Sequence, residues 1–287
     1  MAMRLRWLVS TSTSALHATA ALVAGRELAD SRLFAALEGP AREFGSQKRG
    51  GADAALLLEH LVGLSAGIGN NVELARVALT KIAGGGVATA HAPALARWIA
   101  QVEAEFMAVH PESIGELELR SGPLREQWEA RGDGLLANVV RMAEPELLVE
   151  TADVVPVHPA VGGQGHAHHL YNLVRIEAVL ANPFPDLPEV VRLAWLLAQL
   201  NVDLPRYQGE MKQGRAVEVG SLALLPAVCN AAQEVELVRD ASASVARAVE
   251  LWKLPTDAAV LVTWWETYCE ARLAWPAAVA ALDRMLA

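Results

Sequence analysis

Four of the chain's eight histidines lie within the glycine-rich segment His158–His169. Imidazole binds divalent metals and transfers protons near neutral pH, so this segment is where the sequence concentrates groups capable of chemistry. His166 and His168 are two positions apart and in an extended strand would point to the same side, whereas His169 would point away. A catalytic metal site usually has three protein ligands. We therefore expect His158 or a distant residue to complete a site with His166 and His168.

A second set of polar side chains follows directly. Residues 170–180 alternate in a way that favours a strand, and this alternation places His169, Tyr171, Arg175 and Glu177 on one side. Such a row suits the binding of a carboxylate or phosphate by Arg175, with His169 as a base. The alternative interpretation is a cross-strand salt bridge on the solvated side of a sheet.

Short β-branched runs on either side of the histidine segment predict a small β-hairpin or sheet near residues 147–182, with that segment as its loop and Pro156 on an edge. Helical patterns surround this insertion. After an Asp186 cap, residues 190–200 are apolar almost all round, which is typical of a central buried helix.

The composition points to a mainly α fold. Hydrophobic residues make up 53% of the 287 residues and charged residues 20%, with alanine and leucine abundant and aromatics few. That balance favours packed helices around the small β insertion, a mainly α (α+β) class. No repeat or low-complexity linker divides the chain, so we expect a single domain or two tightly packed lobes, 1–145 and 146–287.

One stretch resembles the lead-in to the metal-binding helix of zincin metallopeptidases. A strand at Val174–Leu180 is followed by Asn182-Pro183, then Asp186-Leu187-Pro188, then a helix. In zincins that helix carries H-E-x-x-H. The corresponding positions here read Trp195-Leu196-Leu197-Ala198-Gln199, so the resemblance covers only residues 174–199 and transfers neither a zinc ligand nor a catalytic glutamate.

Charge and cysteine content restrict the partners and the compartment. The net charge is −9 and no run of lysine and arginine exists, which argues against nucleic-acid binding. The run Arg4–Val9 begins like a signal peptide, but polar residues 10–14 interrupt it, and nothing approaches a membrane span. Cys229 and Cys269 lack CxxC neighbours and are expected to be buried free thiols, so we expect a cytoplasmic protein.

Two functions are compatible with these features. The first is a non-catalytic helical protein that binds an unknown partner or self-associates, without a cofactor, through the region of Trp264 and Trp265. The second is a hydrolase that uses zinc or another divalent metal. His158, His166 and His168 would bind the metal, Glu177 or a remote carboxylate would be the base, and Arg175 would orient an anionic substrate.

Overall fold

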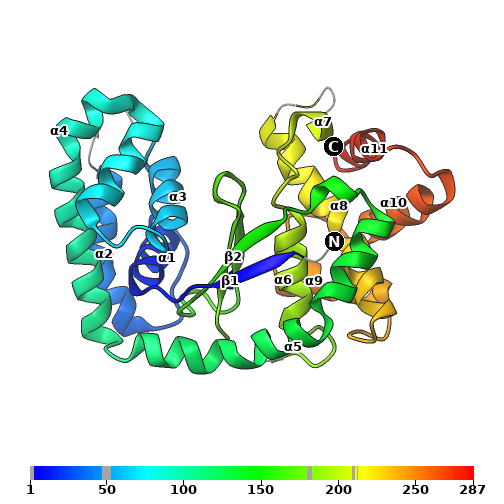
Figure 1. The fold of residues 1–287 in the computed structure, drawn as a ribbon, viewed down its shortest axis with the longest axis horizontal. Helices are drawn as coiled ribbons and strands as arrows, with labels where there is room; N and C mark the ends of the chain where they lie inside the picture. Colours follow the sequence, from blue (N-terminus) through cyan, green and yellow to red (C-terminus); the bar gives the residue numbers. More distant parts are fainter. Residues whose placement is uncertain (1–2, 47–52, 180–182, 209–210, 212) are drawn as a thin grey trace.

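The computed structural model describes residues 3–46, 53–179, 183–208, 211 and 213–287. Leu180 and Asn182, which belong to the predicted strand and to the zincin resemblance, lie outside the described residues. Helices make up most of the described chain, and a small mixed sheet lies between two groups of them (Figure 1). The prediction of a mainly α fold with a small sheet is confirmed.

The first group of helices packs around its own hydrophobic core, which is built from leucine and alanine side chains with Phe44, Trp98 and Phe106. Side-chain oxygens of Ser10, Asp53 and Asn70 accept hydrogen bonds from free backbone N–H groups and so begin three of these helices. The group consists of α1 (Thr11–Val23), α2 (Ser31–Ser46), α3 (Ala54–Ser65) and α4 (Asn71–Val109).

The second group packs around a larger core on the other side of the sheet (Figure 1). The long helix α5 (Ser113–Met142) leads from the first group to the second. All ten residues of α6 (Glu189–Ala198) are buried, as predicted for a central helix, although its N-cap is Pro188 and not Asp186. The remaining members of this group are α7 (Pro205–Gln208), α8 (Gln213–Glu234), α9 (Ala241–Leu251), α10 (Ala258–Ala271) and α11 (Trp275–Met285).

The sheet has the strand order β1-β2-β4-β3, in which β1, β2 and β4 are parallel and β3 is antiparallel to β4. Its strands are β1 (Arg4–Trp7), β2 (Thr151–Val157), β3 (Gly165–His168) and β4 (Leu173–Glu177). The strand β1, absent from the sequence prediction, adds the N-terminal run to the edge of the sheet.

The hairpin differs from the predicted one. Residues 158–164 link β2 to β3, and the hairpin is β3–β4, which a 3₁₀ turn (His169–Tyr171) closes. The predicted hairpin partners β2 and β4 are parallel neighbours. Pro156 is not on an edge strand, but β1 ends opposite Val154, so the missing N–H of Pro156 costs no bond to β1.

One helix, Gly214–Glu234 within α8, is long and apolar enough to cross a membrane by length and composition. Within the fold 72% of its apolar window is buried. Its buried leucine, valine and alanine side chains belong to the larger core. This is the position of a core helix.

Candidate metal centre

Three side chains that suit a divalent metal meet between the sheet and α3. Nε2 of His166 lies 3.0 Å from Oε1 of Glu59, and Nδ1 of His168 lies 2.5 Å from the same oxygen. One ligand atom from each residue falls within 4.8 Å of the other two. Because zinc bonds to nitrogen and oxygen are about 2.0–2.2 Å long, a group of this size can share one ion after small adjustments.

Strand geometry brings the two histidines together. Alternate residues of β3 share a face, and the ring centroids of His166 and His168 are 4.7 Å apart. As predicted, both rings lie on the same side of the strand. In the β3–β4 pair His166 is opposite Arg175 and His168 is opposite Leu173, which sets the position of both ligands along the sheet.

The third member, Glu59, comes from the middle of α3. This helix lies very close to the hairpin turn: a Cβ added to Gly63 would be 2.5 Å from Cδ2 of Tyr171 and 3.2 Å from Nδ1 of His168. Only a glycine at position 63 allows this approach. Gly63 is one helical turn beyond Glu59, so the absence of its side chain lets the Glu59 carboxylate reach the histidines.

The polar environment of His168 fits a ligand role. Its side chain is buried, and despite the short distance to Glu59 neither ring nitrogen makes a hydrogen bond of acceptable geometry. A buried polar ring without hydrogen bonds is costly. Burial lowers the pKa of His168 to about 4, and Glu59 offsets only part of that shift, so the imidazole is neutral and has a free lone pair. A metal ion would satisfy it.

Glu59 is ionised in this setting. Burial raises the pKa of its carboxyl group, but the adjoining side chains of His166 and His168 more than reverse the effect and hold the pKa well below its usual range. The centre therefore combines two imidazoles with one carboxylate anion, a set of ligands that zinc and other first-row transition metals accept.

A pocket of about 270 Å³ opens beside the cluster. Glu59 and His166 line it together with Arg26, Gln164 and Arg175. A metal held by the cluster would thus face a space large enough for a small substrate group, as a catalytic site with an open coordination position requires.

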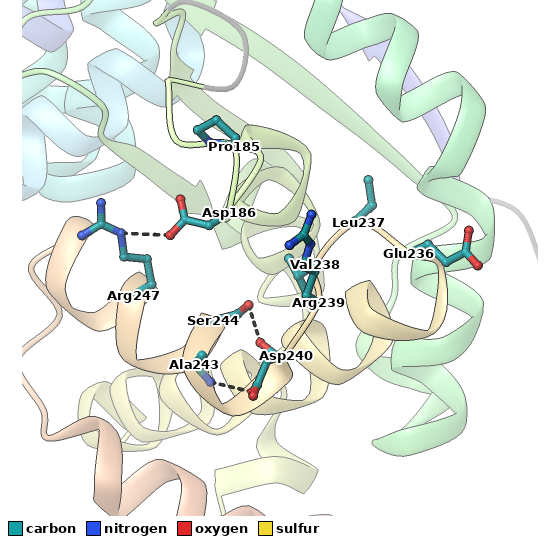
Figure 2. Close-up of a pocket in the computed structure, with 10 residues that line it drawn as sticks. All are labelled: Pro185, Asp186, Glu236, Leu237, Val238, Arg239, Asp240, Ala243, Ser244 and Arg247. Carbon is teal, nitrogen blue, oxygen red and sulfur yellow. Dashed lines mark hydrogen bonds and ion pairs between the residues drawn. The ribbon is translucent and has the colours of Figure 1, made fainter.

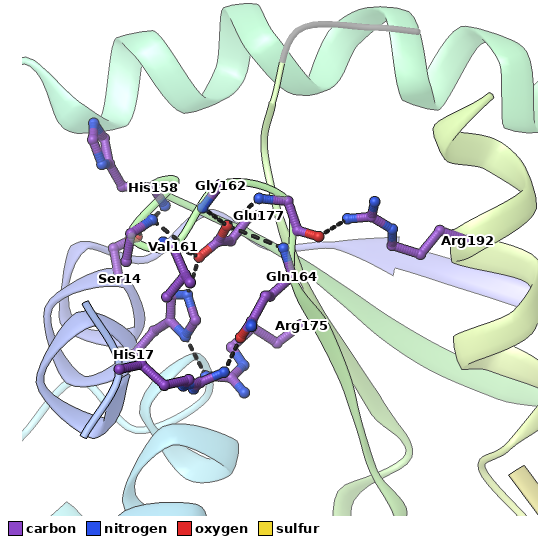
Figure 3. Close-up of polar contacts among 12 residues, drawn as sticks. Ser14, His17, His158, Val161, Gly162, Gln164, Arg175, Glu177 and Arg192 are labelled. Carbon is purple, nitrogen blue, oxygen red and sulfur yellow. Dashed lines mark hydrogen bonds and ion pairs between the residues drawn. The ribbon is translucent and has the colours of Figure 1, made fainter. Parts of the chain in front are cut away.

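A buried hydrogen-bond chain holds Arg175 in the wall of this pocket (Figure 3). Arg175 donates through Nη1 to Nδ1 of His17, and Nε2 of His17 donates to Oε1 of Glu177 over 2.7 Å. Burial first, and the charge of Arg175 second, lower the pKa of His17 to about 4. The neutral ring can therefore accept from the arginine at one nitrogen and donate to the carboxylate at the other.

Glu177 is at the centre of a backbone loop (Figure 3). Its two carboxylate oxygens accept hydrogen bonds of 2.5–3.0 Å from the five consecutive N–H groups of residues 160–164. Gly162 and Gly163 adopt positive φ angles of 96° and 101°, which glycine tolerates and which turn these N–H groups inward. Burial raises the pKa of Glu177, but His17 and these N–H groups outweigh it and lower the pKa well below its usual range.

Arg175 and Glu177 share one face of β4, as predicted, but that face is buried and not solvated. Both carboxylate oxygens of Glu177 already accept hydrogen bonds, and these bonds fix the conformation of residues 160–164. The geometry therefore gives it a structural role in place of the predicted role as a base.

His158 lies apart from the cluster and next to a different histidine. Its ring packs against that of His110 with centroids 3.9 Å apart, and its Nε2 is 3.9 Å from a carboxylate oxygen of Glu116. The backbone N–H of His158 donates to Oγ of Ser14 over 3.1 Å. The structure thus groups His166 and His168 with Glu59, a remote residue, and not with His158.

His169 and Tyr171 leave the predicted row because residues 169–171 form a 3₁₀ turn that Asn172 ends in the left-handed conformation, with φ 45°. Nδ1 of His169 lies 3.1 Å from the carbonyl oxygen of Gln199. Tyr171 contacts Nδ1 of His60 through its hydroxyl group. His169 therefore faces α6 and not the pocket.

A larger hollow of about 450 Å³ lies beside the first turn of α9 (Figure 2). Several of its polar groups have partners: Asp240 caps the helix by accepting from the N–H of Ala243, and Arg247 pairs with Asp186 at 3.4 Å. Its described lining contains no histidine or cysteine. Its described lining residues do not form a group of three metal ligands.

Trp264 and Trp265 are buried in the second core, and Nε1 of Trp264 donates to the carbonyl oxygen of Ala278 over 2.8 Å. Tyr268 stacks on Trp264 with the rings inclined by 8°. Trp264 thus holds α10 against α11. Partner binding or self-association through the surrounding surface stays a prediction.

Sequence reasoning missed Glu59. The signal present is a charged residue inside Ala54–Ser65, a helix that is otherwise strongly apolar. A carboxylate in an apolar helix that packs on the sheet needs a partner, so this glutamate could have been matched with the histidines. Arg26 and His17 carried no comparable signal.

Comparison of the chain with protein-family models, curated proteins and solved structures found no match. A function for the chain must therefore be inferred from the geometry of its candidate metal centre.

Proposed function

We propose that this protein binds one divalent transition-metal ion through Glu59, His166 and His168 and uses it for hydrolysis. The observation that carries the proposal is the convergence of three ligand atoms within 4.8 Å, one of them on a buried histidine that has no hydrogen bond. His158, which the sequence pattern suggested as a ligand, has no place in this set.

The ligand types favour zinc, with iron, manganese and cobalt as alternatives. Two histidines with one glutamate occur in catalytic zinc sites that keep an open position for water, and a similar set binds non-haem iron. A metal in such a site lowers the pKa of bound water to about 7, which supplies a nucleophile at neutral pH.

The pocket supports a simple division of roles. Glu59 is the only carboxylate among its described lining residues, and it is a proposed ligand. No separate base is needed, because the metal itself activates the water. Arg175 keeps its predicted role of orienting an anionic substrate, since its guanidinium lies in the same wall.

We also propose a cytoplasmic location. Cys229 and Cys269 are both free; Cys229 is buried as predicted, whereas Cys269 is exposed. An exposed unpaired thiol is compatible with a reducing compartment. A tagged copy found in a secreted or membrane fraction would contradict this proposal.

The metal content of protein purified without a histidine tag tests the central proposal. We expect about one ion per chain after exposure to zinc and dialysis, and loss of it in Glu59→Gln and His168→Ala. His91→Ala is the matched control, because His91 lies on α4 outside the cluster. Full metal content in both cluster variants would contradict the proposal, provided that circular dichroism shows them folded.

A further inference from the structure

Two arginines in the pocket wall have no anionic partner. Arg26 and Arg175 both line the pocket beside Glu59 and His166, and neither has a carboxylate oxygen within 4.0 Å among the described residues. Arg175 is buried and Arg26 is half-buried. Cations removed from water without a carboxylate partner are rare in proteins because the removal costs several kcal/mol.

Arg175 is held in place by a hydrogen bond, but no carboxylate of the described residues contacts it. It is 9% exposed, it donates a hydrogen bond to the neutral ring of His17, and its Nε has no partner. Glu177, two residues along β4, does not serve as a counter-ion in contact, because its oxygens are occupied by the loop N–H groups and by His17.

Arg26 reaches the same pocket from the end of α1. The backbone N–H of Arg26 donates to the carbonyl oxygen of Ala21, and the backbone N–H of Gly25 donates to that of Leu22. These two hydrogen bonds end the helix and turn the chain toward the pocket. The guanidinium of Arg26 contacts Oε1 of Gln164, a neutral group, and its Nε is also buried without a partner.

Arg192 is a nearby buried arginine that, unlike Arg26 and Arg175, has a carboxylate partner. Arg192 in α6 is also buried, and its Nη2 lies 3.2 Å from Oε1 of Glu189. Arg192 also donates to the carbonyl oxygen of Gly163 (Figure 3). The pairing that stabilises Arg192 is missing at Arg26 and Arg175, so their charges are available for a ligand.

We infer that Arg26 and Arg175 form an oxyanion-binding subsite, and that the substrate carries a carboxylate or phosphate group next to the bond that is broken. Arg175 is the cross-strand partner of His166, and side chains so paired have Cβ atoms about 5 Å apart. An oxyanion between the two guanidinium groups would lie beside the metal ligands. The subsite deepens the proposed hydrolase function, and its link to bond cleavage rests on that function.

Anion binding by the metal-free protein is the direct test. Calorimetric titration with inorganic phosphate, and separately with acetate, is run in EDTA at constant ionic strength with chloride as the reference ion. We expect one site, whose dissociation constant rises by about tenfold or more in Arg26→Gln and in Arg175→Gln. Arg42→Gln, which changes an exposed arginine paired with Glu38, is the control and should bind as the parent does.

The two anions distinguish the substrate classes: tighter phosphate binding assigns a phosphate ester or anhydride, and tighter acetate binding assigns a carboxylate. Arg26→Gln should keep its zinc, so a failure of the metal proposal is separable from a failure of this one. Absence of binding by the parent protein for both anions, or equal binding by folded Arg26→Gln and Arg175→Gln, would overturn the subsite.

Discussion

His166 and Arg175 face each other across the antiparallel β3–β4 pair, so that a candidate metal ligand and a buried cation share one face of the sheet. The same face carries His168 and, at the far end, Glu177. Helix α3 adds Glu59 to this face and α1 adds His17. One short hairpin thereby presents both the candidate metal ligands and the candidate anion site to a single pocket.

Metal binding should stabilise the folded protein. A ligand that binds only the native state at 100 times its dissociation constant adds about 2.7 kcal/mol to the free energy of unfolding. We expect urea unfolding in the presence of zinc to show a gain of this order over EDTA, and Glu59→Gln to show none of it. An equal gain in Glu59→Gln would place the bound zinc elsewhere.

Gly63→Ala should weaken metal binding. The added Cβ would lie 2.5 Å from Cδ2 of Tyr171, so α3 or the hairpin turn must move and carry Glu59 away from the histidines. We expect a loss of zinc affinity together with a destabilisation of about 1–3 kcal/mol.

Gly134→Ala is the matched control for Gly63→Ala. Gly134 is an exposed glycine in α5, where a Cβ would meet Val235 at an ordinary 3.5 Å. That variant should gain up to about 1 kcal/mol from helix propensity and keep its zinc affinity. If both variants bind zinc as tightly as the parent, the close approach of α3 has no role at the site.

Glu177→Gln should lower the free energy of unfolding and should not remove a catalytic group. The amide would place an NH₂ group against backbone N–H groups that now donate to a carboxylate oxygen, so a loss of about 3 kcal/mol is expected in urea unfolding. Glu116→Gln, at an exposed position near His158, should have little effect. If Glu177→Gln is as stable as the parent but has lost hydrolase activity, the predicted role of Glu177 as the base is supported.

Acid should destabilise the metal-free protein between pH 6.5 and about 4. Burial lowers the pKa of His17 and of His158 to about 4, with the charge of His110 adding to the effect at His158. The unfolded chain, with histidine pKa values near 6.5, binds protons in this window that the native state excludes. The stability contribution is therefore complete above pH 6.5 and is lost as pH falls.

His158→Gln tests the part of that loss due to His158. Each such histidine contributes a slope of up to about 1.4 kcal/mol per pH unit in the free energy of unfolding. Urea unfolding at several pH values should show a smaller slope in His158→Gln than in the parent. An unchanged slope would mean that His158 titrates normally in the native state.

Much of the local structure was predictable from the sequence. The period of two placed His166 and His168 on one side of a strand, and the unbroken apolar run predicted the buried helix α6. The same period failed for His169 and Tyr171, because a 3₁₀ turn ending at Asn172 interrupts the alternation. The alternation of residue types indicates which side chains share a face only where the chain really is an extended strand.

Long-range pairing was not predictable from these patterns. Glu59 is 107 residues from His166, and its approach depends on Gly63 and on the packing of α3 against the hairpin turn. The parallel alignment of β2 with β4 depends on a crossover through β3, which adjacent β-branched runs do not signal. Arg175 belongs to a buried network and not to the solvated salt bridge that was considered for it. Its partner His17 is on α1, and the sequence patterns do not show that α1 packs on this face of the sheet.

An anomalous difference map from zinc-soaked crystals, recorded at the zinc absorption edge, would locate a bound ion directly. We expect one strong peak about 2.0–2.2 Å from a carboxylate oxygen of Glu59, from Nε2 of His166 and from Nδ1 of His168. A peak at the adjacent rings of His110 and His158 instead, or no peak at the Glu59 cluster under saturating zinc, would contradict the proposed metal centre.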